Sequence, residues 1–271
     1  MKSQSFRTSV CNFAVLLLMC CALDVAVLAQ VQDSEDPAAN PGRPTVSTPA
    51  TLTPTGYLQV ETGFVGAESS PEFKSLYSLI SVMKLAVSSR LEVLTSVEPI
   101  AHFTAGSTGN ATADYFLGIQ GVLIQGEGAK PTLAVSYLHR LYDGTAPEPD
   151  FGSPTNSFIV LASADVKGFH YDANGFLNEL VNKPIRRAQF GQSLTISHSL
   201  PYRLTISGEI WRFTQPFLRN NAIGNLWAVS YQARKTLVLD VGYNQGLTGT
   251  STQHELLVGF TYLLPHRLWG N

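Results

Sequence analysis

The spacing of the apolar segments constrains the fold of this chain more than any other feature. From Tyr57 to Leu264, about twelve stretches of about ten residues alternate apolar and polar side chains. Short gaps predict tight turns at Ser88 to Arg90, Gly126 to Lys130, Asp172 to Gly175, Ser199 to Tyr202 and Arg234 to Thr236. Longer polar gaps intervene, as at Pro99 to Ala113, Tyr142 to Asn156 and Thr214 to Gly224. Outer-membrane barrels have this rhythm, with short periplasmic turns and longer outer loops.

Segment length separates a membrane barrel from a soluble sandwich, because the strands of both alternate. About eleven residues at roughly 3.3 Å each, tilted near 45°, cover about 25 Å, which matches the apolar band of a membrane barrel. Sandwich strands are usually nearer five or six residues. We therefore predict an all-β fold: a transmembrane up-and-down antiparallel β-barrel of about 12 strands over residues 56–264.

The first 29 residues resemble a secretory signal. Lys2 and Arg7 precede an apolar run from Phe13 to Ala22, and small residues then lead to a predicted cleavage site after Ala29. A membrane anchor is the alternative, but the run is shorter than a bilayer-spanning helix requires. The expected location is the cell outer membrane, reached after export across the inner membrane.

Composition supports this placement. All three cysteines lie in the predicted signal, so the mature chain forms neither a disulfide nor a thiolate metal site. A closed sheet supplies stability instead, because every backbone group finds a partner within it. Charged residues make up only 14% of the chain, which suits a lipid-facing surface, and the net charge of -2 argues against a nucleic-acid partner.

Residues 30–55 differ from the rest of the chain because they are rich in proline. The five prolines cannot pair in a central strand, so we expect an extended segment. Two placements stay open for this periplasmic N-terminal segment: a free tether, or a segment that folds back and occupies the barrel mouth. Residues 265–271 form a predicted tail after the last strand.

Charged residues within the strands mark the predicted inner face of the barrel. A charge near the midplane on the lipid face costs roughly 2 to 4 kcal/mol, so such residues belong inside. The predicted lumen-lining residues are Glu61, Lys84, Glu92, Asp165, Lys167, Glu209, Asp240 and Glu255. They could attract cationic groups, or the carboxylates could pair with Lys84, Lys167 or Arg212 in a network that merely fills the lumen.

Aromatic residues gather near segment ends, where interfacial girdles are expected in a membrane barrel. The predicted girdle residues are Tyr57, Phe64, Tyr115, Tyr137, Tyr171, Phe213, Trp227, Tyr231 and Tyr262.

Catalytic motifs are lacking in the sequence. The six histidines are scattered, and neither a Gly-x-Ser-x-Gly elbow nor a His-x-x-x-His pair occurs. Ser197 with His198 and Ser251 with His254 lie too close in sequence to suggest an assembled triad. We therefore predict no enzyme activity, no catalytic residue, no cofactor and no metal site.

Three sequence segments carry a resemblance to a known family. The first runs from Arg43-Pro44 through the Pro-containing stretch to Gln59, Glu61 and Gly63-Phe64. The second is Leu91-Glu92-Val93, and the third runs from Leu237 to Leu247 and on through Leu257 to Tyr262. Over about residues 42 to 264 the chain resembles the meta-pathway phenol-degradation family of outer-membrane transporters, although that family commonly ends on an aromatic soon after its last strand.

The resemblance implies an outer-membrane barrel for the uptake or passage of small, often aromatic molecules, and does not imply an enzyme. We therefore expect passive transport of small molecules, with outer-membrane lipids, the barrel assembly machinery and small-molecule solutes as partners. A non-conducting structural or ligand-binding barrel is the alternative. The sequence does not determine the oligomeric state.

Overall fold

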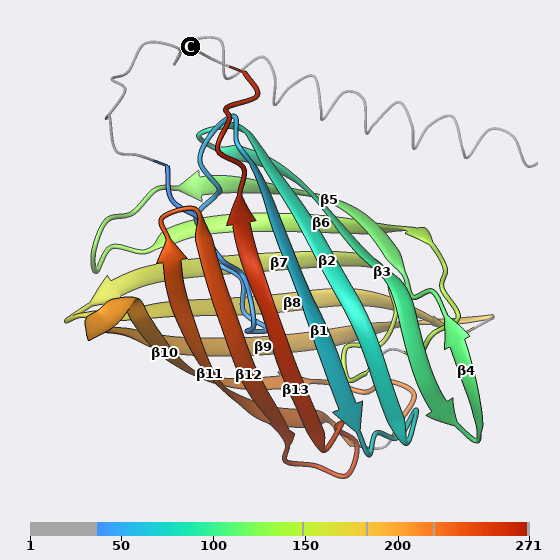
Figure 1. Cartoon of the computed structure of the whole chain (residues 1–271). Helices are drawn as coiled ribbons and strands as arrows, with labels where there is room; N and C mark the ends of the chain where they lie inside the picture. The colour runs from blue at the N-terminus through green and yellow to red at the C-terminus, as the bar shows by residue number, and fades with distance from the viewer. Residues whose placement is uncertain (1–36, 148, 183, 219, 270–271) are drawn as a thin grey trace, which may run out of the picture. The chain divides into compact units, whose positions relative to one another are not determined.

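A computed structural model describes residues 37–269 except residues 148, 183 and 219. The predicted signal, residues 1–29, and its cleavage site lie outside the described residues. Nearly all of the described chain is β-structure (Figure 1). No helix among the described residues is long and apolar enough to cross a membrane.

Thirteen strands form one antiparallel sheet, and twelve of them close into a ring. The strands are β1 Leu58–Glu68, β2 Ser75–Ser88, β3 Leu91–Ala105, β4 Ser107–Ala111, β5 Tyr115–Ile124, β6 Thr132–Tyr142, β7 Pro154–Val166, β8 Phe169–Asn182, β9 Ile185–Leu200, β10 Leu204–Phe213, β11 Ala222–Arg234, β12 Leu237–Gly246 and β13 His254–Leu263. Each strand of the ring pairs with the next one along the chain, except that β3 pairs with β5, and β1 closes the ring by pairing with β13. Strand β4 pairs only with β3 and extends the wall. The structure therefore confirms the predicted fold class.

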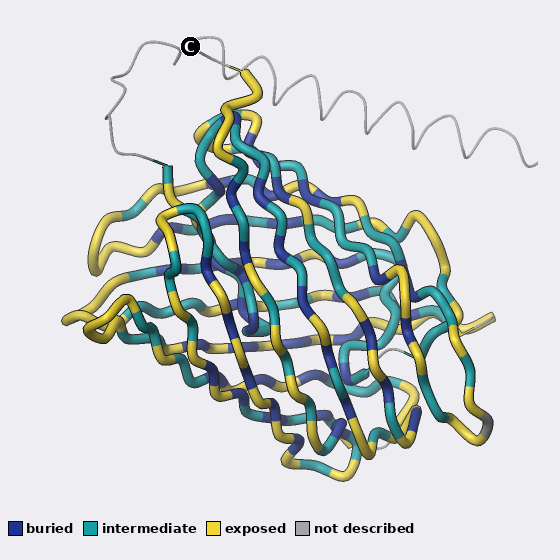
Figure 2. The backbone as a smooth tube through the Cα atoms, viewed as in Figure 1, coloured by how far each residue is buried: buried dark blue, intermediate teal, exposed yellow. Residues whose placement is uncertain are grey.

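The two faces of the wall alternate residue by residue, as Figure 2 shows along most strands. In β12, Asp240 faces inward and is 5% exposed, whereas Leu239 and Val241 face outward and are 44% and 45% exposed. Because the side-chain period of a strand is two, this alternation separates a polar inner face from an apolar outer face.

The two rims differ in their connections. The turns after β2, β5, β7, β9 and β11 lie at one end, here called the short-turn rim. The connections after β1, β6, β8, β10 and β12, and the one from β3 to β5, lie at the other end, the long-loop rim, where the one after β8 spans two residues and the others are longer. On the long-loop rim β3 continues through Ala105 and folds into a hairpin with β4. The predicted loop from Pro99 to Ala113 is therefore mostly strand.

One predicted turn is wrong. Asp172 to Gly175 lies inside β8, and the chain turns earlier, at Lys167 and Gly168. Both turn residues have positive φ, 52° and 83°, and glycine adopts this conformation without a steric cost. The glycine that sets the turn is thus Gly168.

The proline-rich segment folds back into the barrel over the part that is described, residues 37–55. In Figure 1 it is the blue segment that runs inside the ring before β1. It does not hang free as a tether, and the second of the two expected placements applies. The predicted tail also contacts the short-turn rim, where the Leu268 amide donates a hydrogen bond to the carbonyl of Gly56 at 2.7 Å.

Candidate transport lumen

Residues 37–55, here called the plug segment, enter and leave the lumen by the short-turn rim. The Ala39 amide donates to the carbonyl of Lys235 at 2.9 Å, which fixes the entering arm to the β11–β12 turn. Asn40 Nδ2 donates to the Thr51 carbonyl at 2.9 Å and so joins the entering arm to the leaving arm. The leaving arm then continues through Gly56 into β1. The plug segment is therefore a closed loop inserted into the barrel.

Glu209 of β10 holds the tip of the plug segment. Its carboxylate accepts the Val46 amide at 2.8 Å, the Ser47 amide at 2.6 Å and the Ser47 hydroxyl at 2.7 Å. The Ser47 hydroxyl also lies 2.8 Å from Ser193 Oγ of β9. Hydrogen bonds to a charged acceptor are stronger than neutral ones, so this contact anchors a backbone that has no strand partner.

Two further carboxylates hold the arms. Glu92 of β3 accepts the Thr53 amide at 2.8 Å and the Thr53 hydroxyl at 2.5 Å. Glu61 of β1 accepts the Gly42 amide at 3.2 Å and pairs with Lys84 of β2 at 2.6 Å. Glu61 thus combines contact to the plug segment with a buried ion pair that balances its charge.

Neutral side chains of the wall hold the rest of the plug segment. Asn174 of β8 accepts the Thr48 amide at 2.7 Å and donates to the Thr48 carbonyl at 3.0 Å, as a neighbouring strand would. Ser163 Oγ of β7 accepts the Ala50 amide at 2.7 Å. The wall therefore replaces the backbone hydrogen bonds that an extended segment would otherwise lack.

Small residues in the wall make room for Arg43 and Pro44. Gly63 of β1 lies directly opposite Gly259 of β13, and a Cβ at Gly63 would overlap the Arg43 guanidinium. A Cβ at Gly259 would lie 2.8 Å from Arg43 Nε, and one at Gly242 would lie 3.0 Å from Pro44 Cγ. Arg43 pairs with Asp240 of β12 at 3.6 Å. These three strands form a flat seat for the entering arm.

Aromatic side chains fill the lumen nearer the long-loop rim. Trp211 and Phe213 of β10 are each 1% exposed and pack with Phe151 and Phe176. Val46 of the plug segment packs against the same cluster. Glycines on the adjacent strands, Gly191 and Gly224, lie against the rings, where any Cβ would overlap them. The predicted girdle residue Phe213 is therefore a lumen residue, because it shares the inward parity of Glu209.

The loop between β6 and β7, residues 143–153 and here called the capping loop, folds over this aromatic cluster and caps the mouth. Asp150 in this loop is 4% exposed and accepts the amide of Thr252, from the β12–β13 loop, at 2.9 Å. Burial raises the pKa of Asp150 to about 8, and the nearby Glu255 carboxylate adds to the rise, while hydrogen bonds from Thr252 oppose it. Asp150, with its raised pKa, therefore docks one loop against another.

A polar cavity of about 400 Å³ lies beside the plug segment toward the short-turn rim. Asn40, Arg43 and Thr51 line it from the plug segment. Hydroxyl and amide side chains of β9 to β11 line the opposite wall, together with Arg203 and Asp172. The cavity is large enough for a small polar molecule.

The predicted lumen residues fall into three groups. Glu61, Lys84, Glu92, Glu209 and Asp240 face inward, are at most 9% exposed, and contact the plug segment or an internal partner. Glu255 also faces inward, but it accepts the Asn244 amide at 2.6 Å nearer the long-loop rim. It pairs in register with Ala67, about 20 Å along β1 from Glu61, so it does not join Glu61 and Asp240 in one acidic cluster.

Asp165 and Lys167 lie at the short-turn rim. The Asp165 side chain is 66% exposed and contacts His170, while Lys167 lies in the turn after β7 and is exposed. The structure thus places both beside the lumen entrance, outside the inner wall. The prediction that Arg212 could pair with carboxylates inside the lumen is wrong. Arg212 is exposed on the outer face, because it lies three residues after the inward-facing Glu209 on the same strand.

Sequence analysis missed the neutral residues that hold the plug segment. Asn174, Ser163 and Gln120 occupy inward positions, but polar side chains are ordinary on either face of a strand near a rim. Strand parity could have placed them inside, and only the path of the plug segment gives them partners.

Comparisons with known proteins bear on the fold. No family model and no curated protein matches the sequence. Similar solved structures include an outer-membrane channel from Pseudomonas putida F1, with a TM-score of 0.58 and 11% identity over 87% of this chain and 100% of that chain. The KdgM porin matches with a TM-score of 0.54 and 9% identity, over 75% of this chain and 98% of that one. The NanC porin matches with a TM-score of 0.54 and 11% identity, over 76% and 100%.

The chain has the fold of an outer-membrane porin. The outer membrane as its location, with lipid around the outer face, stays an expectation from the sequence with which this fold is consistent. Identities near 10% show the fold alone, so the solute is a separate question. Membership of the meta-pathway phenol-degradation family stays a prediction from the sequence.

Proposed function

We propose that this barrel lets small molecules cross the outer membrane passively, and that the plug segment sets the width of the path. The observation that carries the proposal is the cavity of about 400 Å³ between the plug segment and strands β8 to β11. It provides solute-sized space inside the ring on the side where solutes would leave the barrel. Glu61, Glu92, Glu209, Asp240 and Glu255 would line or shape this path, and Asp165 and Lys167 would flank its entrance.

Aromatic or hydrophobic molecules are the solutes that the other half of the lumen suits best. Trp211, Phe213, Phe176 and Phe151 pack together below the capping loop, so a solute ring would pass by replacing one of these aromatic contacts. Aromatic pairs add about 0.5 to 1.5 kcal/mol beyond the burial of area, so a small ring would be retained weakly enough to leave again.

A non-conducting barrel is the second candidate, and a specific observation favours it. The plug segment contacts the wall on every side through Glu61, Glu92, Asn174 and Glu209, and the capping loop covers the opposite mouth. In that case the internal charges serve only to pack the lumen.

Conductance of the purified chain in planar lipid bilayers distinguishes the two candidates. Glu209→Ala removes the acceptor of three hydrogen bonds from the tip of the plug segment, so we expect a conductance at least about threefold above wild type, because each lost charged hydrogen bond is worth about 1.5 to 3 kcal/mol. Asp240→Ala, which frees Arg43, should change ion selectivity.

Gln192→Ala is the matched control, because Gln192 lies on the neighbouring strand β9 and faces outward. It should leave conductance unchanged. Correct folding of each variant is checked by the shift of its gel band on heating. If folded wild type and both lumen variants conduct no current, the barrel is closed and the channel proposal fails.

A further inference from the structure

We propose that the outer wall of this barrel carries a binding site for a phosphate-bearing lipid of the outer leaflet, with Arg212 holding the phosphate and a groove over Gly208 holding one acyl chain. The proposal concerns the outer face of the sheet. It does not depend on whether the lumen conducts.

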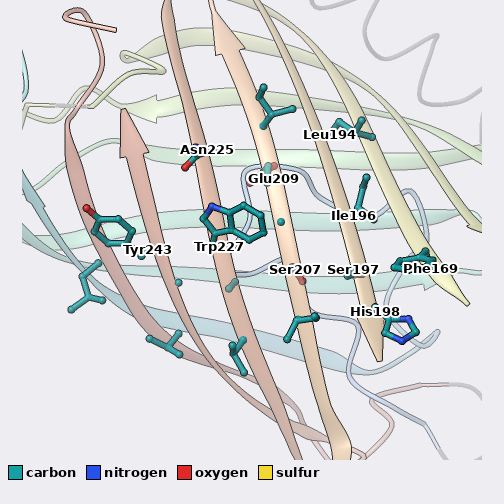
Figure 3. Close-up of a pocket in the computed structure, with 18 residues that line it drawn as sticks. Phe169, Leu194, Ile196, Ser197, His198, Ser207, Glu209, Asn225, Trp227 and Tyr243 are labelled. Atoms are coloured by element: carbon teal, nitrogen blue, oxygen red, sulfur yellow. The ribbon is translucent and has the colours of Figure 1, made fainter. Parts of the chain in front are cut away.

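The groove has a volume of about 810 Å³ and crosses strands β8 to β13 on the lipid-facing side (Figure 3). Gly208 of β10 forms part of its floor, because it is an outward position without a side chain. Trp227 of β11 lies beside it, 66% exposed, with its ring 3.0 Å from where a Cβ of Gly208 would be. Leu194 and Ile196 of β9 line the opposite side in Figure 3.

The groove is longer than the depth of one leaflet. It begins beside Phe169 and His198, next to the turn after β7, and its lining on β10 runs from Ile206 to Ile210, with Arg212 at the next outward position. Half of an apolar band of about 25 Å is about 12 Å, which a strand tilted near 45° covers in about five residues. Five residues before Arg212 reach just past Gly208. An acyl chain lying over Gly208 would therefore bring its head group to the level of Arg212.

Arg212 is well suited to hold a phosphate. It is exposed on the outer face, one residue before β10 ends at the long-loop rim. No carboxylate of the described residues forms an ion pair with it, whereas Arg186, on β9 at the same rim, pairs with Glu179 at 2.8 Å. An unneutralised arginine at the edge of an apolar band turns toward the head groups, and its guanidinium matches phosphate in a two-point geometry.

Polar outward side chains also occur near Arg212 on the neighbouring strands. Gln192 of β9 lies opposite Arg212. Asn225 of β11 lies opposite Ile210, two residues before Arg212, and continues in register to Gln245 of β12 and His254 of β13. Asn225 lines the groove, and its buried Oδ1 makes no hydrogen bond to the described residues. These side chains form the polar end of a site whose remaining walls are apolar.

Native mass spectrometry of the purified full chain tests the site, with diphosphorylated lipid A and its dephosphorylated form as probes. We expect wild type to bind one diphosphorylated molecule about tenfold more tightly than the dephosphorylated form, because charge-assisted hydrogen bonds to phosphate are lost in the latter. Arg212→Gln should remove this preference. Gly208→Leu should weaken both probes, because its side chain fills the groove and displaces Trp227.

Arg186→Gln is the matched control, since this arginine lies at the same rim but is already paired; it should bind as wild type does. Equal binding of the two probes by wild type would overturn the proposal, as would equal losses in Arg212→Gln and Arg186→Gln. A dimer of this chain that Gly208→Leu dissociates would also overturn it, because the groove would then be covered by a second copy. Arg212→Gln alters an exposed side chain, so it remains decisive even if Gly208→Leu does not fold.

Discussion

The two ends of the lumen are closed by opposite kinds of contact. Toward the short-turn rim, carboxylates and amides of the wall hold the backbone of the plug segment through directional hydrogen bonds. Toward the long-loop rim, Trp211 and Phe213 fill the space by packing, and one loop docks through Asp150. The hydrogen bonds fix the path of the plug segment, which has no strand partner. The aromatic packing fills the space inside the ring without setting a path for the backbone. Loss of hydrogen bonds at the short-turn rim should therefore let the plug segment move out of the lumen, whereas loss of an aromatic side chain at the long-loop rim should destabilise the fold.

The largest effect is expected from removing the aromatic filling. Trp211→Ala deletes a side chain that is 1% exposed, so we expect a loss of about 3 to 5 kcal/mol in the free energy of unfolding. Trp227→Ala removes the same side chain from the outer face, where it is 66% exposed, and should cost far less. Urea unfolding in lipid vesicles measures both. Equal losses would contradict a packed outer half of the lumen.

A smaller effect is expected at the seat of the plug segment. Gly63→Ala introduces a Cβ that overlaps the Arg43 guanidinium, and overpacking costs about 1 to 3 kcal/mol, so the plug segment should leave the lumen about tenfold more often. Ala50→Cys, fully buried and the only cysteine once residues 1–29 are removed, reports this through its rate of labelling by a thiol reagent.

Gly175→Ala is the control for this experiment, because its Cβ would enter open space on the outer face. Labelling of Ala50→Cys should be unchanged in that background. If Ala50→Cys is labelled as slowly with Gly63→Ala as without it, Arg43 adjusts without moving the plug segment, and the prediction is wrong.

The smallest effect concerns pH at the capping loop. The pKa of Asp150 is raised to about 8 in the docked loop, well above the ordinary value of about 4, so the docked state binds a proton that the free loop does not. Docking is therefore strongest below pH 4 and weakens as the pH rises toward 8. We expect conductance to rise several-fold between pH 7 and pH 9 in wild type, and to lose this dependence in Asp150→Asn. A wild-type conductance that falls over this range would refute the assignment.

Strand parity carried most of the prediction, because a closed membrane sheet requires one face to be polar and the other apolar. It placed Glu61, Glu92, Glu209 and Asp240 on one face, and these side chains lie inside the ring. It failed where a strand ends. Lys167 was predicted to line the lumen but belongs to the turn after β7, because the sequence alone does not show that the chain turns at Gly168.

The plug contacts were beyond sequence analysis for a different reason. Ser47 meets Glu209, which is 162 residues later in the chain, and Thr48 meets Asn174 across 126 residues. No local pattern encodes such pairs. The proline content of residues 30–55 excluded a central strand but left both a tether and insertion open, and it favoured the tether.

The covalent continuity between the plug segment and β1 makes the plug an intramolecular ligand. Short flexible links commonly give effective concentrations in the millimolar range, so individually weak contacts are enough to keep a tethered segment bound most of the time. The same link limits how far the segment can travel when it is released. A departing plug segment therefore remains a competitor of any solute for the same wall residues, and each passage event would end with its return.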